Sequence, residues 1–111
     1  MKILVVDDHA LVREGLRQVL KGLAERVEVL EAARCSAAFE LAAAHPDLDL
    51  VLLDLGLPDL NGLDALDHFG LHLADVPVIV LSGTDDPGLM RASFARGAAG
   101  FIPKSSLSDV L

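Results

Sequence analysis

Cysteine, aromatic rings and long apolar runs are scarce in this chain of 111 residues. The single cysteine, Cys35, cannot form an internal disulfide and has no second cysteine with which to hold zinc. Tyrosine and tryptophan are absent, so neither ring is available to enclose a flavin. The apolar runs are far shorter than the ~18 to 20 residues of a membrane-spanning helix. We therefore expect a cytoplasmic protein without membrane contact.

Basic residues are also few. Nine lysines and arginines stand against 17 acidic residues, which gives a net charge of −8, and the basic residues form no run. Proteins that bind nucleic acid do so with clustered lysine and arginine. The composition therefore argues against direct nucleic-acid contact by this domain.

The apolar residues form short continuous runs. They make up 52% of the chain, and the length allows one domain, residues 1–111. Continuous rather than alternating runs are typical of parallel strands that helices cover on both faces. We expect strands at residues 3–6, 27–32, 50–53, 78–81 and 100–103.

The segments between these runs have helical spacing. The first helix is expected over residues 9–24, with an apolar stripe and an opposite polar face. The expected buried residues are Val12, Leu16, Val19, Leu20 and Leu23, and the expected outward residues are Arg13, Glu14, Arg17, Gln18 and Lys21.

Proline, glycine and capping residues mark the ends of the later helices. Pro46 ends a helix over residues 36–45, and Asn61-Gly62 begins one that runs to about His72. Asp86, Pro87 and Gly97 bracket a fourth helix as cap, first residue and C-terminal glycine, and Ser105 or Ser106 caps a last one that we expect to be truncated. Five strand-helix units in strict alternation predict a doubly wound α/β fold, (βα)5, with a five-stranded parallel sheet.

Polar residues of different chemical kinds follow four of the strands. Asp7 and Asp8 end the first run, Asp54 the third, Ser82 the fourth and Lys104 the fifth. Each residue alone has an ordinary structural role, such as helix cap, turn residue or solvated side chain. Because ligands bind at the carboxyl ends of the strands in such sheets, five of them at one edge predict a site.

The residue types at this edge suit magnesium-dependent phosphoryl transfer. Crowded carboxylates repel one another unless a cation lies between them, and Mg²⁺ prefers hard oxygen ligands. Gly56 is placed to offer a backbone carbonyl to the metal, and Asp54, alone on the central strand, is the best nucleophile. Lys104 and Ser82 would then contact the phosphoryl oxygens.

These residues occur in an order that resembles a known family. The similar stretches are Asp7-Asp8-His9 with Val12-Arg13-Glu14-Gly15-Leu16, Leu53-Asp54-Leu55 with Pro58 and Gly62, Leu81-Ser82-Gly83, Arg96-Gly97-Ala98, and Gly100-Phe101 with Pro103-Lys104-Ser105. Over essentially its whole length the chain resembles a response-regulator receiver domain of two-component signalling, in the NarL/FixJ (LuxR-type) subgroup. The resemblance implies a flavodoxin-like fold with strand order 2-1-3-4-5.

The resemblance also implies roles for individual residues. Asp54 would be the phosphoacceptor, Asp8 a direct Mg²⁺ ligand with Asp7 assisting, and Ser82 and Lys104 the switch hydroxyl and the paired lysine. Phe101 falls at the switch aromatic; because phenylalanine has no hydroxyl, only the packing part of that switch would operate. Its other interpretation is an ordinary core or edge aromatic. Positions 56 and 84, glycine and threonine, offer no charged side chain to position a hydrolytic water.

The partners follow from the same resemblance. A sensor histidine kinase would donate the phosphoryl group, and the phosphorylated form would homodimerise. The domain would catalyse only its own phosphorylation and dephosphorylation. It would regulate transcription through a C-terminal DNA-binding domain that residues 1–111 do not include. The alternative is a stand-alone receiver that acts in a phosphorelay or as an adaptor.

Two other protein classes fit the residues less well. A hydrolase of the haloacid dehalogenase type normally has a second acid two residues after its nucleophile, where this chain has Gly56. An FMN-binding flavodoxin has a phosphate-binding loop rich in serine, threonine and glycine after its first strand, where this chain has Asp7 and Asp8.

Overall fold

The computed structural model describes residues 1–23 and 26–109 as a sheet flanked by helices. The strands are β1 (Lys2–Val6), β2 (Glu28–Ala32), β3 (Leu50–Asp54), β4 (Val78–Ser82) and β5 (Gly100–Pro103). The helices are α1 (Ala10–Lys21), α2 (Cys35–Ala44), α3 (Gly62–His72) and α4 (Pro87–Ala95), and a 3₁₀ helix, η1 (Lys104–Asp109), follows β5. Across these described ranges no helix is both long and apolar enough to cross a membrane.

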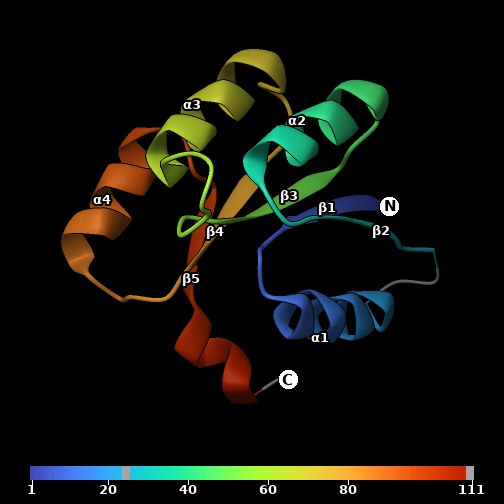
Figure 1. The fold of residues 1–111 in the computed structure, drawn as a ribbon, viewed down its shortest axis with the longest axis horizontal. Helices are drawn as coiled ribbons and strands as arrows, with labels where there is room; N and C mark the ends of the chain where they lie inside the picture. Colours follow the sequence, from blue (N-terminus) through green and yellow to red (C-terminus); the bar gives the residue numbers. More distant parts are fainter. Residues whose placement is uncertain (24–25, 110–111) are drawn as a thin grey trace.

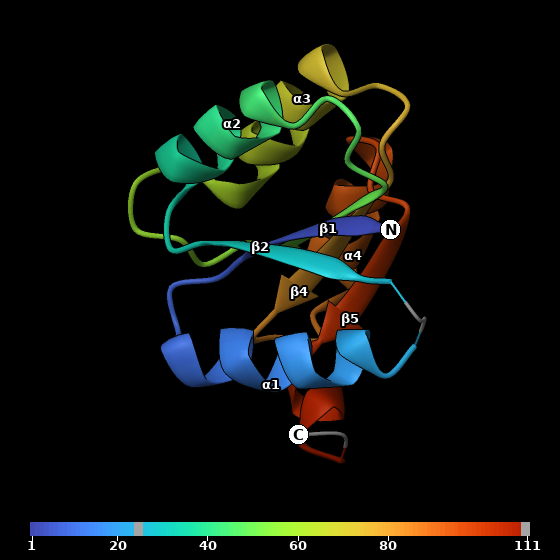
Figure 2. The ribbon, with the colours of Figure 1, turned by 90° about the vertical axis from the view of Figure 1, so that its right-hand side faces the viewer.

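The five strands are parallel and lie in the order β2-β1-β3-β4-β5. Figure 1 shows α2 and α3 side by side on one face of the sheet and α1 on the other, and the turned view in Figure 2 agrees. The predicted flavodoxin-like, doubly wound fold and its strand order are confirmed. The chain leaves β1 for β2 on one side and returns to β3 on the other, so the order reverses between β1 and β3, where such sheets bind ligands.

The central strands are buried on both faces, which explains their continuous apolar sequence. Leu4 and Val6 of β1 belong to the core cluster that includes residues of α2 and α3. Ile3 and Val5 belong to the cluster on the other face, which includes Leu16 of α1. Side chains alternate between the faces of a strand, so each face of β1 needs its own apolar set.

Two helices begin as their sequence signals predict. The side chain of Asn61 caps α3 by accepting a backbone hydrogen bond at 2.9 Å, and Asp86 does the same for α4 at 3.0 Å, with Pro87 in the first helical turn. Gly97, just past α4, has a φ of 98°, a left-handed conformation that glycine adopts without strain.

The first helix is shorter than predicted. It begins at Ala10 and ends at Lys21, where the expectation was residues 9–24, and Gly22 is its C-terminal cap. Leu23, expected in the buried stripe, lies beyond this end and is 73% exposed. The prediction was wrong here because helical spacing alone does not locate the last turn.

The last element also differs from the prediction. It begins at Lys104 and is a 3₁₀ helix, not an α-helix capped by Ser105 or Ser106. A segment of this length gains few hydrogen bonds for the backbone it must fix, and short helical pieces commonly take the tighter pattern. Residues 110–111 lie outside the described residues.

Candidate functional site

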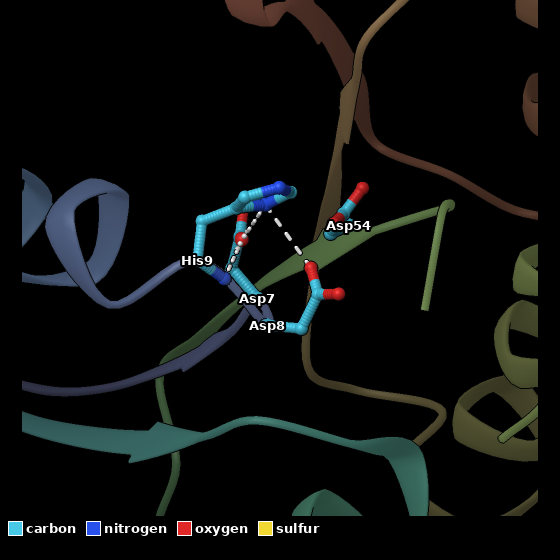
Figure 3. Close-up of side chains that lie close together, drawn as sticks. All are labelled: Asp7, Asp8, His9 and Asp54. Atoms are coloured by element: carbon cyan, nitrogen blue, oxygen red, sulfur yellow. Dashed lines mark hydrogen bonds and ion pairs between the residues drawn. The ribbon is translucent and has the colours of Figure 1, made fainter. Parts of the chain in front are cut away.

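The acidic cluster forms where the two central strands end. Asp54 is the last residue of β3, Asp7 follows β1 directly, and the strands pair so that Val6 lies opposite Leu53. Their carboxylates therefore meet at one level of the sheet. Figure 3 shows them with Asp8 and His9: one ligand atom from each of Asp7, Asp8, His9 and Asp54 lies within 4.8 Å of the others.

Lys104 compensates the two buried acids of this cluster. Asp7 and Asp54 are almost wholly buried, whereas Asp8 is more open to solvent. The Nζ atom of Lys104 lies 2.8 Å from Asp7 Oδ2 and 3.1 Å from Asp54 Oδ2. Burial by itself would lower the pKa of Lys104, but hydrogen bonding and attraction to Asp7 and Asp54 outweigh it, so the pKa is raised. The predicted convergence of strand ends is thus present for β1, β3 and β5.

The other oxygen of Asp54 is held by its own loop. Asp54 Oδ1 accepts a hydrogen bond from the backbone N–H of Gly56 at 2.9 Å. This contact orients the carboxylate and leaves Oδ2 for Lys104. The proposed use of the Gly56 carbonyl as a metal ligand stays a prediction.

His9 is a member of the cluster that the sequence interpretation missed. Its Nδ1 lies 3.0 Å from Asp7 Oδ1 and 3.0 Å from Asp8 Oδ1, and its backbone N–H donates to Asp7 Oδ1 at 2.8 Å. The available signal was its position, directly after the acid pair and before a helix that starts without a side-chain cap.

Arg13 also contacts the site rather than solvent. Its guanidinium donates to the backbone carbonyl of Asp7 at 2.6 Å, and its Nε lies 3.3 Å from Glu31 of β2. The expectation that Arg13 faces out is wrong. The arginine joins α1 to the loop after β1 and so helps to place Asp7.

Ser82 and Phe101 lie on the two strands beyond the cluster. Ser82 is buried at the end of β4, and its Oγ accepts a hydrogen bond from the backbone N–H of Thr84 at 3.2 Å. Within the described part of the chain no hydrogen bond joins Ser82 to Asp54. Phe101 of β5 is half-buried against the core cluster of α2 and α3. The switch roles of both residues stay predictions.

The cluster has the donors that a divalent cation requires. Three carboxylates supply hard oxygens that lie within 4.8 Å of one another, and the buried Asp7 Oδ2 lies 2.8 Å from Lys104 Nζ. Crowded carboxylate oxygens of this kind suit a small oxygen-seeking cation.

Asp59 ties the loop after β3 to α2. Its Oδ1 accepts from the backbone N–H of Cys35 at 2.9 Å, and its Oδ2 accepts from that of Ser36 at 3.0 Å. These hydrogen bonds from Cys35 and Ser36 lower the pKa of Asp59. Arg34, the residue that precedes α2, makes no side-chain cap, so Asp59 caps this helix from 24 residues further along the chain.

Cys35 itself is a buried, free cysteine. Burial raises the pKa of its thiol to about 11, and the nearby charges of Asp59 and Asp54 act in the same direction. A thiol in this state behaves as a small apolar side chain. Cys35 is the first residue of α2, where a small side chain packs against the core.

Comparison with known proteins identifies relatives of the whole segment. The family model of the response regulator receiver domain matches residues 3–111. The chain is 39% identical over 105 residues to the glycerol metabolism activator of Pseudomonas putida, which covers 95% of this chain and 48% of that protein. It is 33% identical over 110 residues to the transcriptional regulatory protein YdfI of Bacillus subtilis, which covers 99% of this chain and 51% of that protein. The chain thus spans about half the length of the curated relatives it matches.

The fold has close counterparts among solved structures. The signal receiver domain of the putative response regulator NarL from Mycobacterium tuberculosis superposes with a TM-score of 0.85 at 34% sequence identity. The match covers 98% of this chain and 87% of that one.

Proposed function

Because this chain belongs to the response regulator receiver domain family, in its NarL/LuxR-type subgroup, we propose that it accepts a phosphoryl group from a sensor histidine kinase onto Asp54. The observation that carries the proposal is the environment of this carboxylate. Asp54 is buried at the end of the central strand β3, with the Gly56 amide on one oxygen and the Lys104 ammonium on the other.

The proposed reaction is a direct transfer. An oxygen of Asp54 attacks the phosphorus of a phosphohistidine, the bond from phosphorus to the imidazole nitrogen breaks, and the histidine leaves with that electron pair and takes up a proton. The product is an acyl phosphate on Asp54. The Gly56 N–H holds the carboxylate in one orientation, and orientation of this kind lowers the barrier by avoiding entropy loss during the reaction.

Asp7, Asp8 and Asp54 would hold Mg²⁺ together with the Gly56 carbonyl. When bound, the cation would neutralise the carboxylates and the incoming phosphoryl oxygens. Lys104 would move its contact from Asp54 Oδ2 to a phosphoryl oxygen, since both are anionic acceptors within reach of a flexible side chain.

Signal output would follow from the two strands next to the site. The Ser82 hydroxyl would turn from the Thr84 amide to the phosphoryl group, and Phe101 would repack as β4 and β5 adjust. Phosphorylation would shift an existing equilibrium between an inactive and an active state. The size of the shift is set by how much the free energy of the phosphoryl group's contacts differs between these two states. We propose that the shifted state homodimerises.

The proposed output is transcription regulation by a cytoplasmic protein, through a C-terminal DNA-binding domain outside these 111 residues. The names of the curated relatives, an activator and a transcriptional regulator, and their greater length support this. The domain would act on no substrate other than itself. A stand-alone receiver in a phosphorelay is the alternative, and the reading frame beyond Leu111 distinguishes the two.

Intact-mass measurement tests the phosphoacceptor. Incubated with acetyl phosphate and Mg²⁺, the wild type should gain one phosphoryl group, and chelation of the metal should abolish the gain. Asp54→Asn should gain none. Asp49→Asn is the matched control, because Asp49 is exposed and lies just before the same strand at its other end. An undiminished adduct in Asp54→Asn would exclude this residue as the acceptor.

A further inference from the structure

Two histidines lie one helical turn apart on α3. His68 and His72 are four residues apart, so their side chains lie on the same face of the helix. Their ring centroids are 4.4 Å apart, and the rings are tilted by 43°. His72 ends α3 and His68 lies one turn before it, whereas Asp54 of the acidic cluster precedes the loop that leads into the first turn of this helix.

One of the two rings is held in place by α2. His68 stacks on Phe39 with ring centroids 3.6 Å apart and planes 21° apart, and Phe69 meets it edge-on at 6.3 Å. A ring that packing already fixes loses little freedom when it binds a ligand. His72 is exposed and is the adaptable partner.

Open space adjoins both rings. A cavity of about 300 Å³ lies between α2 and α3, and both imidazoles line it together with Phe39, Ala42 and Leu73. Figure 1 and Figure 2 both show these two helices running next to each other. A ligand held by the two rings would keep open positions toward the cavity and solvent, where water can complete its coordination.

The chemistry of the pair selects the class of ligand. The cavity walls are largely apolar, and burial together with the adjacent His72 lowers the pKa of His68, which favours the neutral ring. Neutral imidazole nitrogens suit Zn²⁺, Cu²⁺ and Ni²⁺, whereas Mg²⁺ prefers oxygen. Two histidines at this spacing on one helix are also the ligand arrangement of helical zinc sites.

We propose that His68 and His72 form a bidentate site for a divalent transition-metal ion. The ion would join two positions one turn apart near the end of α3, next to the contact with α2. The proposal does not depend on the phosphoacceptor function, because it uses a different pair of side chains at a separate place in the fold.

A zinc titration tests this site directly. The full chain is held in excess Mg²⁺, which competes with Zn²⁺ for the carboxylates, and Zn²⁺ binding is followed by calorimetry. Wild type should bind one Zn²⁺, and His72→Gln should bind at least about tenfold more weakly. His45→Gln is the matched control and should bind as the wild type does, since His45 contacts Lys2 rather than another histidine.

A second variant separates ligation from packing. His68→Phe keeps an aromatic ring against Phe39 but removes both nitrogens. It should fold as the wild type does and lose Zn²⁺ binding to the same extent as His72→Gln. Electron paramagnetic resonance with Cu²⁺ should show two coordinated imidazole nitrogens in the wild type and one in either variant. Zinc affinity that is unchanged in both variants, or the absence of zinc binding in excess Mg²⁺, would overturn the proposal.

Discussion

Each end of the sheet has one lysine that bridges two carboxylates, but the carboxylates differ in burial. At the amino end, Lys2 is 18% exposed and contacts Asp47 at 3.0 Å and Glu28 at 3.9 Å, acids that are 67% and 61% exposed. At the carboxyl end, Lys104 is 19% exposed and contacts Asp7 at 2.8 Å and Asp54 at 3.1 Å, acids that are 0% and 4% exposed.

The comparison separates a surface ion pair from a buried one. Water and salt screen the exposed acids around Lys2, so that group contributes little to stability. The buried acids around Lys104 have lost their hydration and depend on the ammonium for compensation. Burying two carboxylates costs folding free energy. The purpose proposed for this arrangement is to present charges to Mg²⁺ and a phosphoryl group.

Removal of the two lysines should give the largest contrast. Lys104→Met leaves two buried carboxylates without their cation, and we expect the metal-free protein to lose about 3 kcal/mol of unfolding free energy. Lys2→Met should lose only a small fraction of this. Urea denaturation of both variants measures the difference. Equal losses would contradict the distinction between the two ends.

Removal of one acid should have a smaller effect of opposite sign. Asp54→Asn relieves repulsion in the cluster and keeps an oxygen that can accept from the Gly56 amide. We expect the metal-free unfolding free energy to stay unchanged or to rise by about 1 kcal/mol. Mg²⁺ should stabilise the wild type by mass action and Asp54→Asn much less, as melting curves in millimolar metal would show. A wild-type melting temperature that is the same with and without Mg²⁺ would count against the metal site.

Two helix caps provide a finer comparison. Asp59→Ala and Asp86→Ala each remove a carboxylate that caps a helix, and each should lower the melting temperature by a few degrees. Only Asp59 lies on the loop that carries Gly56, so only Asp59→Ala should weaken Mg²⁺ binding and increase hydrogen exchange at the Gly56 amide. Equal metal affinity in the two variants would show that Asp59 is a cap alone.

The smallest expected effect is in the pH dependence of stability. The folded-state pKa of Lys104 is raised, so its ammonium stabilises the protein fully below the unfolded value of about 10.4, and this contribution is lost as pH rises through the folded pKa. The difference in unfolding free energy between wild type and Lys104→Met should therefore be constant from about pH 8 to 10 and become smaller above about pH 10. If this difference stayed constant above about pH 10, protonation of Lys104 would not be coupled to folding.

The fold could be predicted from the sequence because its central strands are covered on both faces. Burial on both sides makes β1, β3 and β4 largely continuous apolar runs, and all five observed strands begin and end within one residue of the predicted ones. The ends of the helices were harder to predict from the sequence. Leu23 continues the apolar spacing of α1, but the helix has already ended at Lys21, and spacing carries no information about that end.

The site was predictable where it depends on strand ends and not where it depends on loops. Asp7, Asp54 and Lys104 meet because parallel strands end at one edge. The contact between Asp59 and the start of α2 joins residues that no local pattern relates. The place of His9 in the cluster likewise depends on how the chain turns between β1 and α1.

The most direct test of the account is to locate the phosphoryl group chemically. After phosphorylation in Mg²⁺, borohydride reduction converts an aspartyl phosphate to homoserine, and peptide mass mapping finds the altered residue. Homoserine should form at position 54 and at no other aspartate, although Asp8 is more exposed and lies in the same cluster. Homoserine at position 7 or 8, or a phosphoryl group on His9, would contradict the assignment of Asp54 as the acceptor.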